Sequence, residues 1–189
     1  MTIVRLSVLW MACVNPPLSG QKGMRPGMTL TYLFVGAWPS PDMKPCVREA
    51  IAKWNAAMRA NGTGTRLQEA ASGQAPRLTF IRTTTLRTGT VGSTVKTFDA
   101  EGYVVGGGIQ FTTDPTALSS CAGYTKVTLH ELGHMAGLAD AHYTNGASLM
   151  DQLGGKDDAR GNVPRDVTRC DRNRSRTATP NPPERVGSG

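Results

Sequence analysis

The sequence lacks the features of several common protein classes. No apolar run reaches about 18 residues, so we expect no transmembrane helix and no membrane partner. The glycines at 106–108 are followed neither by Lys-Ser/Thr nor by the start of a helix, which excludes a phosphate-binding loop. The four cysteines never form a CxxC pair, which argues against a cysteine zinc site; they are Cys13, Cys46, Cys121 and Cys170.

Aromatic residues are absent where the positive charge is concentrated. The chain has a formal net charge of +7 and a sequence pI near 9.6. Between residues 160 and 189, seven arginines stand against three acidic residues, with no aromatic residue among them. Nucleic-acid-binding surfaces combine basic with aromatic side chains. A loose basic tail therefore explains the charge, and we expect no nucleic-acid partner.

Length and composition indicate one folded domain. The chain has 189 residues, of which 39% are hydrophobic and 19% are charged, as in ordinary globular proteins. We predict this domain over residues 29–176, with a linker at 21–28 before it and a disordered tail at 177–189 after it. We expect a monomer.

The first residues resemble a secretory signal peptide. Arg5 supplies a positive charge and precedes the apolar stretch Leu6–Val14. We predict a signal peptide over residues 1–20, and hence a secreted, extracellular protein. An N-terminal strand or a misassigned start is the alternative, because no clear cleavage site follows.

Hydrophobic periodicity predicts strands and two long helices. Val47, Ile51, Trp54 and Met58 recur at helical spacing, so residues 47–60 should form a helix with one buried face. Further elements are a helix at 124–135, a flexible segment at 63–76, a short helix at 167–174, and strands at 29–35, 78–83, 90–96, 103–105 and 109–111.

A pattern typical of zinc sites lies in the second helix. His130 and His134 are four residues apart, so both imidazoles project from one helix face and can reach one zinc ion. Glu131 can hold a water on that zinc and take its proton. Gly137 lets the chain leave the helix sharply, so that Asp140 can turn back as the third ligand.

The segment His130–Asp140 resembles the motif of the metzincin peptidases, HExxHxxGxxH or HExxHxxGxxD. Ser148-Leu149-Met150 resembles their Met-turn, in which a methionine lies beneath the metal. The Asp form is similar to that of the snapalysin-like members. Residues 47–54 and 106–111 resemble the first helix and the glycine-led edge strand of the matrixins. The resemblance spans about residues 29–152.

This resemblance implies an α/β (α+β) fold, in which a twisted mixed sheet packs on two long helices. An active-site cleft would run under the edge strand 108–112, where an extended peptide substrate could pair. It implies a zinc metalloendopeptidase acting on a peptide or protein substrate. Its zinc ligands would be His130, His134 and Asp140, and its general base Glu131.

The sequence departs from the family in ways that leave alternatives open. Most metzincins have histidine where Asp140 stands, and His142 replaces it as third ligand if the turn is longer. Gln152 occupies the position of the astacin tyrosine, so no tyrosine ligand is expected. If the protein is exported, one or two disulfides can form. We favour Cys121 with Cys170, because both flank the predicted active-site region.

Two other functions compete with the peptidase. A metzincin-like module could bind zinc without catalysis, but a structural zinc site has no use for Glu131. A gluzincin peptidase takes its third ligand from a glutamate on a later helix. The only glutamate after the motif is Glu184, in the predicted tail, which argues against that family.

Overall fold

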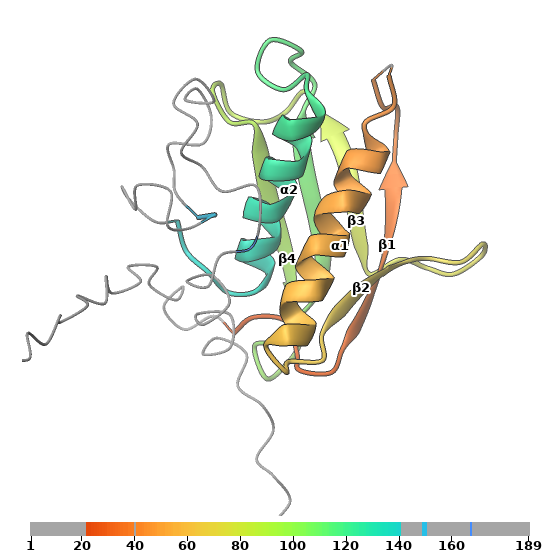
Figure 1. Ribbon diagram of the computed structural model, residues 1–189, viewed down its shortest axis with the longest axis vertical. Helices are drawn as coiled ribbons and strands as arrows, with labels where there is room; N and C mark the ends of the chain where they lie inside the picture. Colours follow the sequence, from red (N-terminus) through yellow and green to blue (C-terminus); the bar gives the residue numbers. More distant parts are fainter. Residues whose placement is uncertain (1–21, 40, 141–148, 151–166, 168–189) are drawn as a thin grey trace, which may run out of the picture.

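The computed structural model describes residues 22–39, 41–140, 149–150 and 167. The predicted signal peptide, the tail at 177–189, His142 and all of the helix at 167–174 except Val167 lie outside these residues. A sheet forms one layer, and two helices cover one of its faces (Figure 1). Among the described helices, none has both the length and the apolar character needed to span a bilayer.

The sheet has five strands: β1 (Thr29–Val35), β2 (Arg66–Glu69), β3 (Leu78–Thr83), β4 (Gly92–Phe98) and β5 (Val104–Thr112). Their order is β2-β1-β3-β5-β4. β1, β2, β3 and β5 run parallel, whereas β4 runs antiparallel to β5 at one edge of the sheet. The expected mixed sheet on two helices is therefore present.

The prediction that residues 108–112 form the edge of the sheet is wrong. Residues 108–112 belong to β5, which lies between β3 and β4, and the edge next to it is β4. The three glycines at 106–108 mark a close backbone approach inside the sheet. A Cβ atom on Gly106 would lie 2.5 Å from the carbonyl oxygen of Arg77, and one on the next glycine would clash with the β4 backbone.

The other strands follow the sequence to different degrees. β1 and β3 have the predicted bounds. β5 joins the strands predicted at 103–105 and 109–111 into one of nine residues. β2 lies within the segment at 63–76 that was expected to be flexible. Only Leu67 of β2 is buried, so its sequence lacks the alternation of apolar and polar residues that predicts a strand.

The two helices are α1 (Lys44–Ala60) and α2 (Cys121–Met135), each starting three residues before its predicted range. The apolar stripe of α1 is buried as predicted. At the start of α2, the Ser120 hydroxyl accepts a hydrogen bond from the Gly123 N–H and caps the helix. The helices lie side by side and start at the same end of the sheet (Figure 1).

A disulfide joins the first turns of the two helices. Cys121 bonds Cys46, so the predicted pairing of Cys121 with Cys170 is wrong. The physical reason is the parallel packing of α1 and α2, which brings their N-terminal ends together across 75 residues of sequence. A local pattern cannot reveal a pairing over that separation.

We expect the double variant Cys46→Ala, Cys121→Ala to be less stable than the wild type by about 2–4 kcal/mol. Opening this long loop returns conformational entropy to the unfolded chain. Urea unfolding followed by circular dichroism measures the difference. Equal free energies of unfolding for the two proteins would show that this bond does not constrain the chain.

Candidate metal centre and active-site cleft

The last two turns of α2 carry His130, Glu131 and His134. The helix ends in the left-handed turn that the sequence predicts, because Gly137 has a φ of +85°. The backbone N–H of Leu138 then donates a hydrogen bond back to the Gly133 carbonyl, which reverses the chain direction. Asp140 follows this reversal and returns to the two histidines.

Three side-chain atoms meet at this point. The Oδ1 atom of Asp140 lies 3.2 Å from Nε2 of His130 and 3.4 Å from Nε2 of His134. A tetrahedral zinc site with bonds of about 2.0–2.1 Å places neighbouring ligand atoms about 3.3–3.4 Å apart. Both distances from Asp140 therefore fit a single metal ion of that size, and all three donor atoms lie within 4.8 Å of one another.

Backbone carbonyls orient both histidine rings. Nδ1 of His130 lies 2.8 Å from the Leu149 oxygen, and Nδ1 of His134 lies 2.9 Å from the Leu138 oxygen. A carbonyl oxygen only accepts hydrogen bonds, so each Nδ1 must carry the hydrogen. In each neutral ring the lone pair is therefore on Nε2, the atom that faces Asp140.

Two imidazole lone pairs and a carboxylate oxygen repel one another at this spacing unless a proton or a metal cation lies among them. The pKa of His130 reflects the same demand for positive charge. Burial lowers this pKa, but the Asp140 carboxylate, the charge of Glu131 and the Leu149 carbonyl outweigh burial and raise it above its ordinary value. The group His130, His134 and Asp140 could therefore bind a metal ion.

The predicted Met-turn residue packs directly against the helix of the site. Met150 is fully buried and forms a small cluster with Leu138. A Cβ atom on Gly133 would clash with the Met150 sulfur, so this glycine allows the close contact. The same segment supplies the Leu149 carbonyl that orients His130. Of the predicted Met-turn, Ser148 lies outside the described residues.

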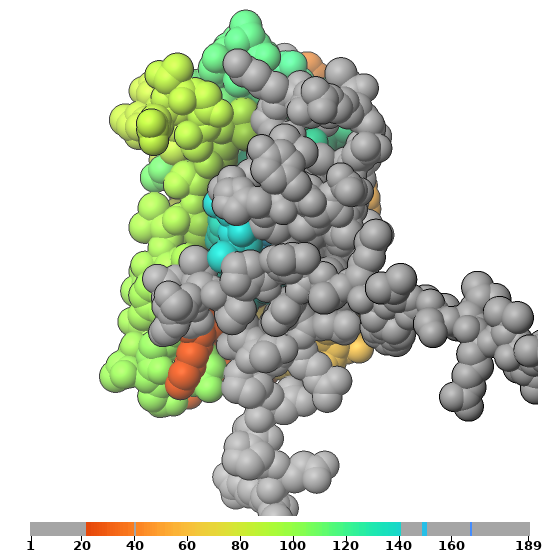
Figure 2. Space-filling view, turned by 90° about the vertical axis from the view of Figure 1, so that its left-hand side faces the viewer, coloured from red at the N-terminus to blue at the C-terminus, as the bar shows by residue number. Residues whose placement is uncertain are grey.

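A cleft of about 450 Å³ lies between β4 and the candidate metal ligands. Figure 2, which looks toward the β4 edge, shows the segment after α2 at the surface beside this strand. Glu131 faces the cleft and is only 4% exposed. The lining residues are Gly92, Ser93, Thr94, Lys96, His130, Glu131, His134 and Asp140.

Four β4 residues of this cleft were not predicted as site residues from the sequence: Gly92, Ser93, Thr94 and Lys96. The prediction of a strand at 90–96 includes them, but no local pattern relates them to α2. Lys96 brings a positive charge to the cleft. Burial lowers the pKa of Lys96 below its ordinary value, and the nearby Glu131 charge opposes that shift.

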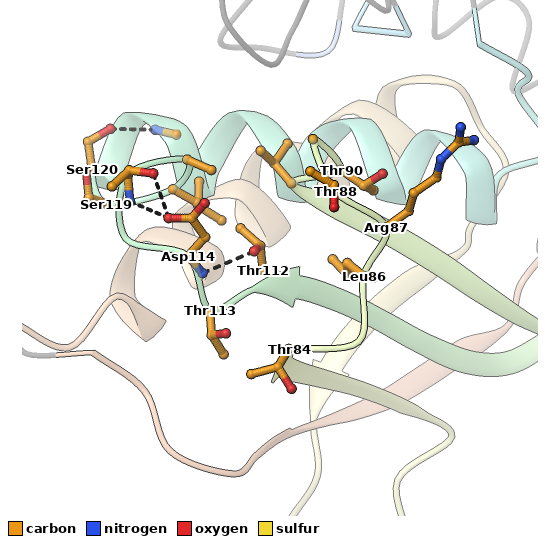
Figure 3. A pocket seen from close by; sticks show the side chains of 16 residues that line it. Thr84, Leu86, Arg87, Thr88, Thr90, Thr112, Thr113, Asp114, Ser119 and Ser120 are labelled. Atoms are coloured by element: carbon orange, nitrogen blue, oxygen red, sulfur yellow. Dashed lines mark hydrogen bonds between the residues drawn. The ribbon is translucent and has the colours of Figure 1, made fainter.

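A larger cavity of about 820 Å³ lies beside the start of β4 (Figure 3). It is lined mostly by threonine and serine side chains from the segments 84–91 and 112–120. Its carboxylate, Asp114, already accepts hydrogen bonds of 2.8 and 2.7 Å from the backbone N–H and the hydroxyl of Thr116. None of the described residues that line this cavity is a histidine, so the smaller cleft is the better candidate for chemistry.

No protein-family model matches the sequence, and no curated protein matches it either. Among solved structures, the chain is similar to the crystal structure of myroilysin, with a TM-score of 0.50 and 13% identity over 89% of this chain and 95% of that one. A second myroilysin structure has a TM-score of 0.42 at 14% identity, covering 82% and 75%. The GM1-bound form of the ECX AB5 holotoxin has 0.47 at 15% identity, covering 79% of each chain. The first of these similarities shows that the overall fold is like that of myroilysin.

Proposed function

We propose that this protein is a zinc-dependent metalloendopeptidase of the metzincin type that hydrolyses peptide or protein substrates. One observation carries the proposal. Two imidazole lone pairs and the Asp140 carboxylate converge beside a buried glutamate, Glu131, in a cleft along a strand edge. The overall fold shared with myroilysin supports the proposal.

The donor set favours zinc. Imidazole nitrogens and a carboxylate oxygen are typical zinc ligands, and here one of each residue type converges with a second imidazole. Three protein ligands, rather than four, are the number found in catalytic sites, where one position stays available to water or substrate. Bound by His130, His134 and Asp140, zinc would lower the pKa of a water molecule and polarise the scissile carbonyl.

In this proposal Glu131 is the general base. It takes a proton from the attacking water and passes it to the leaving amine as the peptide bond breaks. A structural metal site needs no such group. A buried carboxylate next to two candidate ligands therefore favours an enzyme over a non-catalytic zinc-binding module.

The edge strand is suited to bind the substrate backbone. The Thr112 N–H donates to the carbonyl of Val91, the residue just before β4, so Val91 and Thr112 face each other at a hydrogen-bonded position. Antiparallel pairs alternate, and the register therefore directs the backbone groups of Gly92, Thr94 and Lys96 away from β5. We propose that an extended peptide pairs with these groups and passes over the candidate metal ligands.

The most direct test of an enzyme against a binding module uses the purified full-length protein and casein. We expect cleavage that stops when a zinc chelator is added and returns when zinc is restored. A protein that contains one zinc ion per chain but leaves casein and unstructured peptides intact would support the binding module instead.

We further propose that the protein acts outside the cytosol, because the Cys46–Cys121 disulfide persists in oxidising compartments. Fractionation of the native cells should recover it outside the cytosol, and peptide mapping without reductant should find the two cysteines linked. Recovery from the cytosol with both thiols free would contradict this localisation.

A further inference from the structure

We propose that Gly92 and Thr94 of β4 are positioning residues that hold the carboxylate of Glu131 in place. This inference rests on the proposed function, in which Glu131 is the general base. It adds that the edge strand both pairs with the peptide and fixes the orientation of that base. Neither residue is part of the zinc-binding motif, and neither needs to touch the metal.

The first observation is a short hydrogen bond from the strand to the base. The Thr94 hydroxyl lies 2.6 Å from Oε2 of Glu131 and 3.1 Å from the Glu131 backbone carbonyl. A hydroxyl has one hydrogen, so the shorter contact to the charged oxygen is the principal bond. Hydroxyl–carboxylate bonds of this length are among the stronger hydrogen bonds in proteins.

The second observation is the space that Gly92 leaves for the same carboxylate. A Cβ atom on Gly92 would lie 2.7 Å from Oε1 of Glu131 and 2.5 Å from Cγ1 of Val127, one turn earlier on α2. The φ angle of Gly92 is not in the left-handed region, so the backbone itself does not require glycine. Glycine is needed at this position because α2 and β4 approach so closely that no side chain fits between them.

The register of β4 explains why these two residues act together. Residues 92 and 94 are two apart in a strand, so their side-chain positions point to the same side, which here is toward α2. One position leaves room beside Oε1, and the other donates to Oε2. The strand therefore holds the carboxylate at Oε2 and leaves the space that Oε1 needs, which keeps the base in one orientation toward a bound water.

The test compares Thr94→Val, which keeps the shape and removes the hydroxyl, with Thr94→Ser, which keeps the hydroxyl. In the full-length zinc-loaded protein, Thr94→Val should lower kcat about 10- to 100-fold with little change in KM, since misplacing a catalytic group costs rate rather than binding. Thr94→Ser should recover most of the loss. Gly92→Ala should lower kcat by about 100-fold although Thr94 is intact.

A matched control is Thr97→Val, the same substitution at an exposed position of the same strand, outside the cleft. It should behave as the wild type in kcat, KM and Tm. Zinc content should be one per chain in every variant. The positioning role would be overturned if Thr94→Val and Thr94→Ser lost the same amount of kcat. It would also be overturned if kcat fell only in proportion to a lower Tm.

Crystal structures of the zinc-loaded wild type and Thr94→Val give a readout that does not depend on activity. The Glu131 carboxylate should be ordered and bonded to Thr94 in the wild type, and displaced or in several orientations in the variant. An unchanged carboxylate in the variant would overturn the inference. A wild type that cleaves no peptide would instead refute the proposed function, while these structures still decide whether Thr94 positions Glu131.

Discussion

Replacing Glu131 with glutamine should reduce peptide hydrolysis by at least about 10³-fold while leaving zinc binding and the fold intact. Glutamine has nearly the same shape, so the space beside Gly92 remains filled and α2 keeps its packing. It cannot accept the proton from the attacking water. Steady-state kinetics on a fluorogenic peptide, together with the zinc content of the same preparation, measure both parts of this expectation.

The control for this substitution is Glu49→Gln, which makes the same chemical change at an exposed glutamate of α1 that pairs with Lys53. Its activity should equal that of the wild type. If Glu131→Gln also turns over at the wild-type rate, Glu131 is not the base and the proposed mechanism fails. If both variants lose activity along with their circular dichroism spectrum, the loss reflects unfolding rather than chemistry.

Asp140→Ala should weaken zinc binding by at least about 100-fold, because substitutions of residues that merely orient ligands already cost about 10- to 100-fold. The Oδ1 atom of Asp140 lies within 3.4 Å of both candidate histidine donors, so its removal takes away one of three converging atoms. Competition with a chromophoric chelator measures the affinity directly, without reference to turnover.

His142→Ala is the matched comparison, because His142 is the alternative third ligand two residues further along the chain. It should leave the zinc affinity within a few-fold of the wild type, with at most the loss of a contact that orients a ligand. If His142→Ala removes the metal and Asp140→Ala does not, the turn after Gly137 is longer than proposed, and the ligand assignment is wrong.

The candidate metal group could be predicted from the sequence because it is nearly local. His130 and His134 are related by the helical repeat, and Gly137 sets the turn that brings Asp140 back to them. Eleven residues, 130–140, therefore contain the donor atoms and the geometry that joins them. The roles of these residues in zinc binding and catalysis remain predictions until the substitutions are measured.

The wall of the cleft could not be predicted, because it depends on pairing between distant segments. Nothing near Gly92 or Thr94 in the sequence indicates that α2 will pack on them. The same holds for Cys46, whose partner is 75 residues away. The glycines at 106–108 allow a close backbone approach, but their neighbours on both sides become known only when the strand order is known.

Stoichiometric reconstitution of the metal-free protein tests the central claim most directly. The protein would be stripped with a chelator, dialysed, and titrated with zinc while peptide hydrolysis and bound zinc are followed in the same samples. The account predicts that activity rises in proportion to bound zinc and reaches its maximum at one zinc ion per chain. Activity that persists in the metal-free protein, or full zinc loading without any hydrolysis, would contradict it.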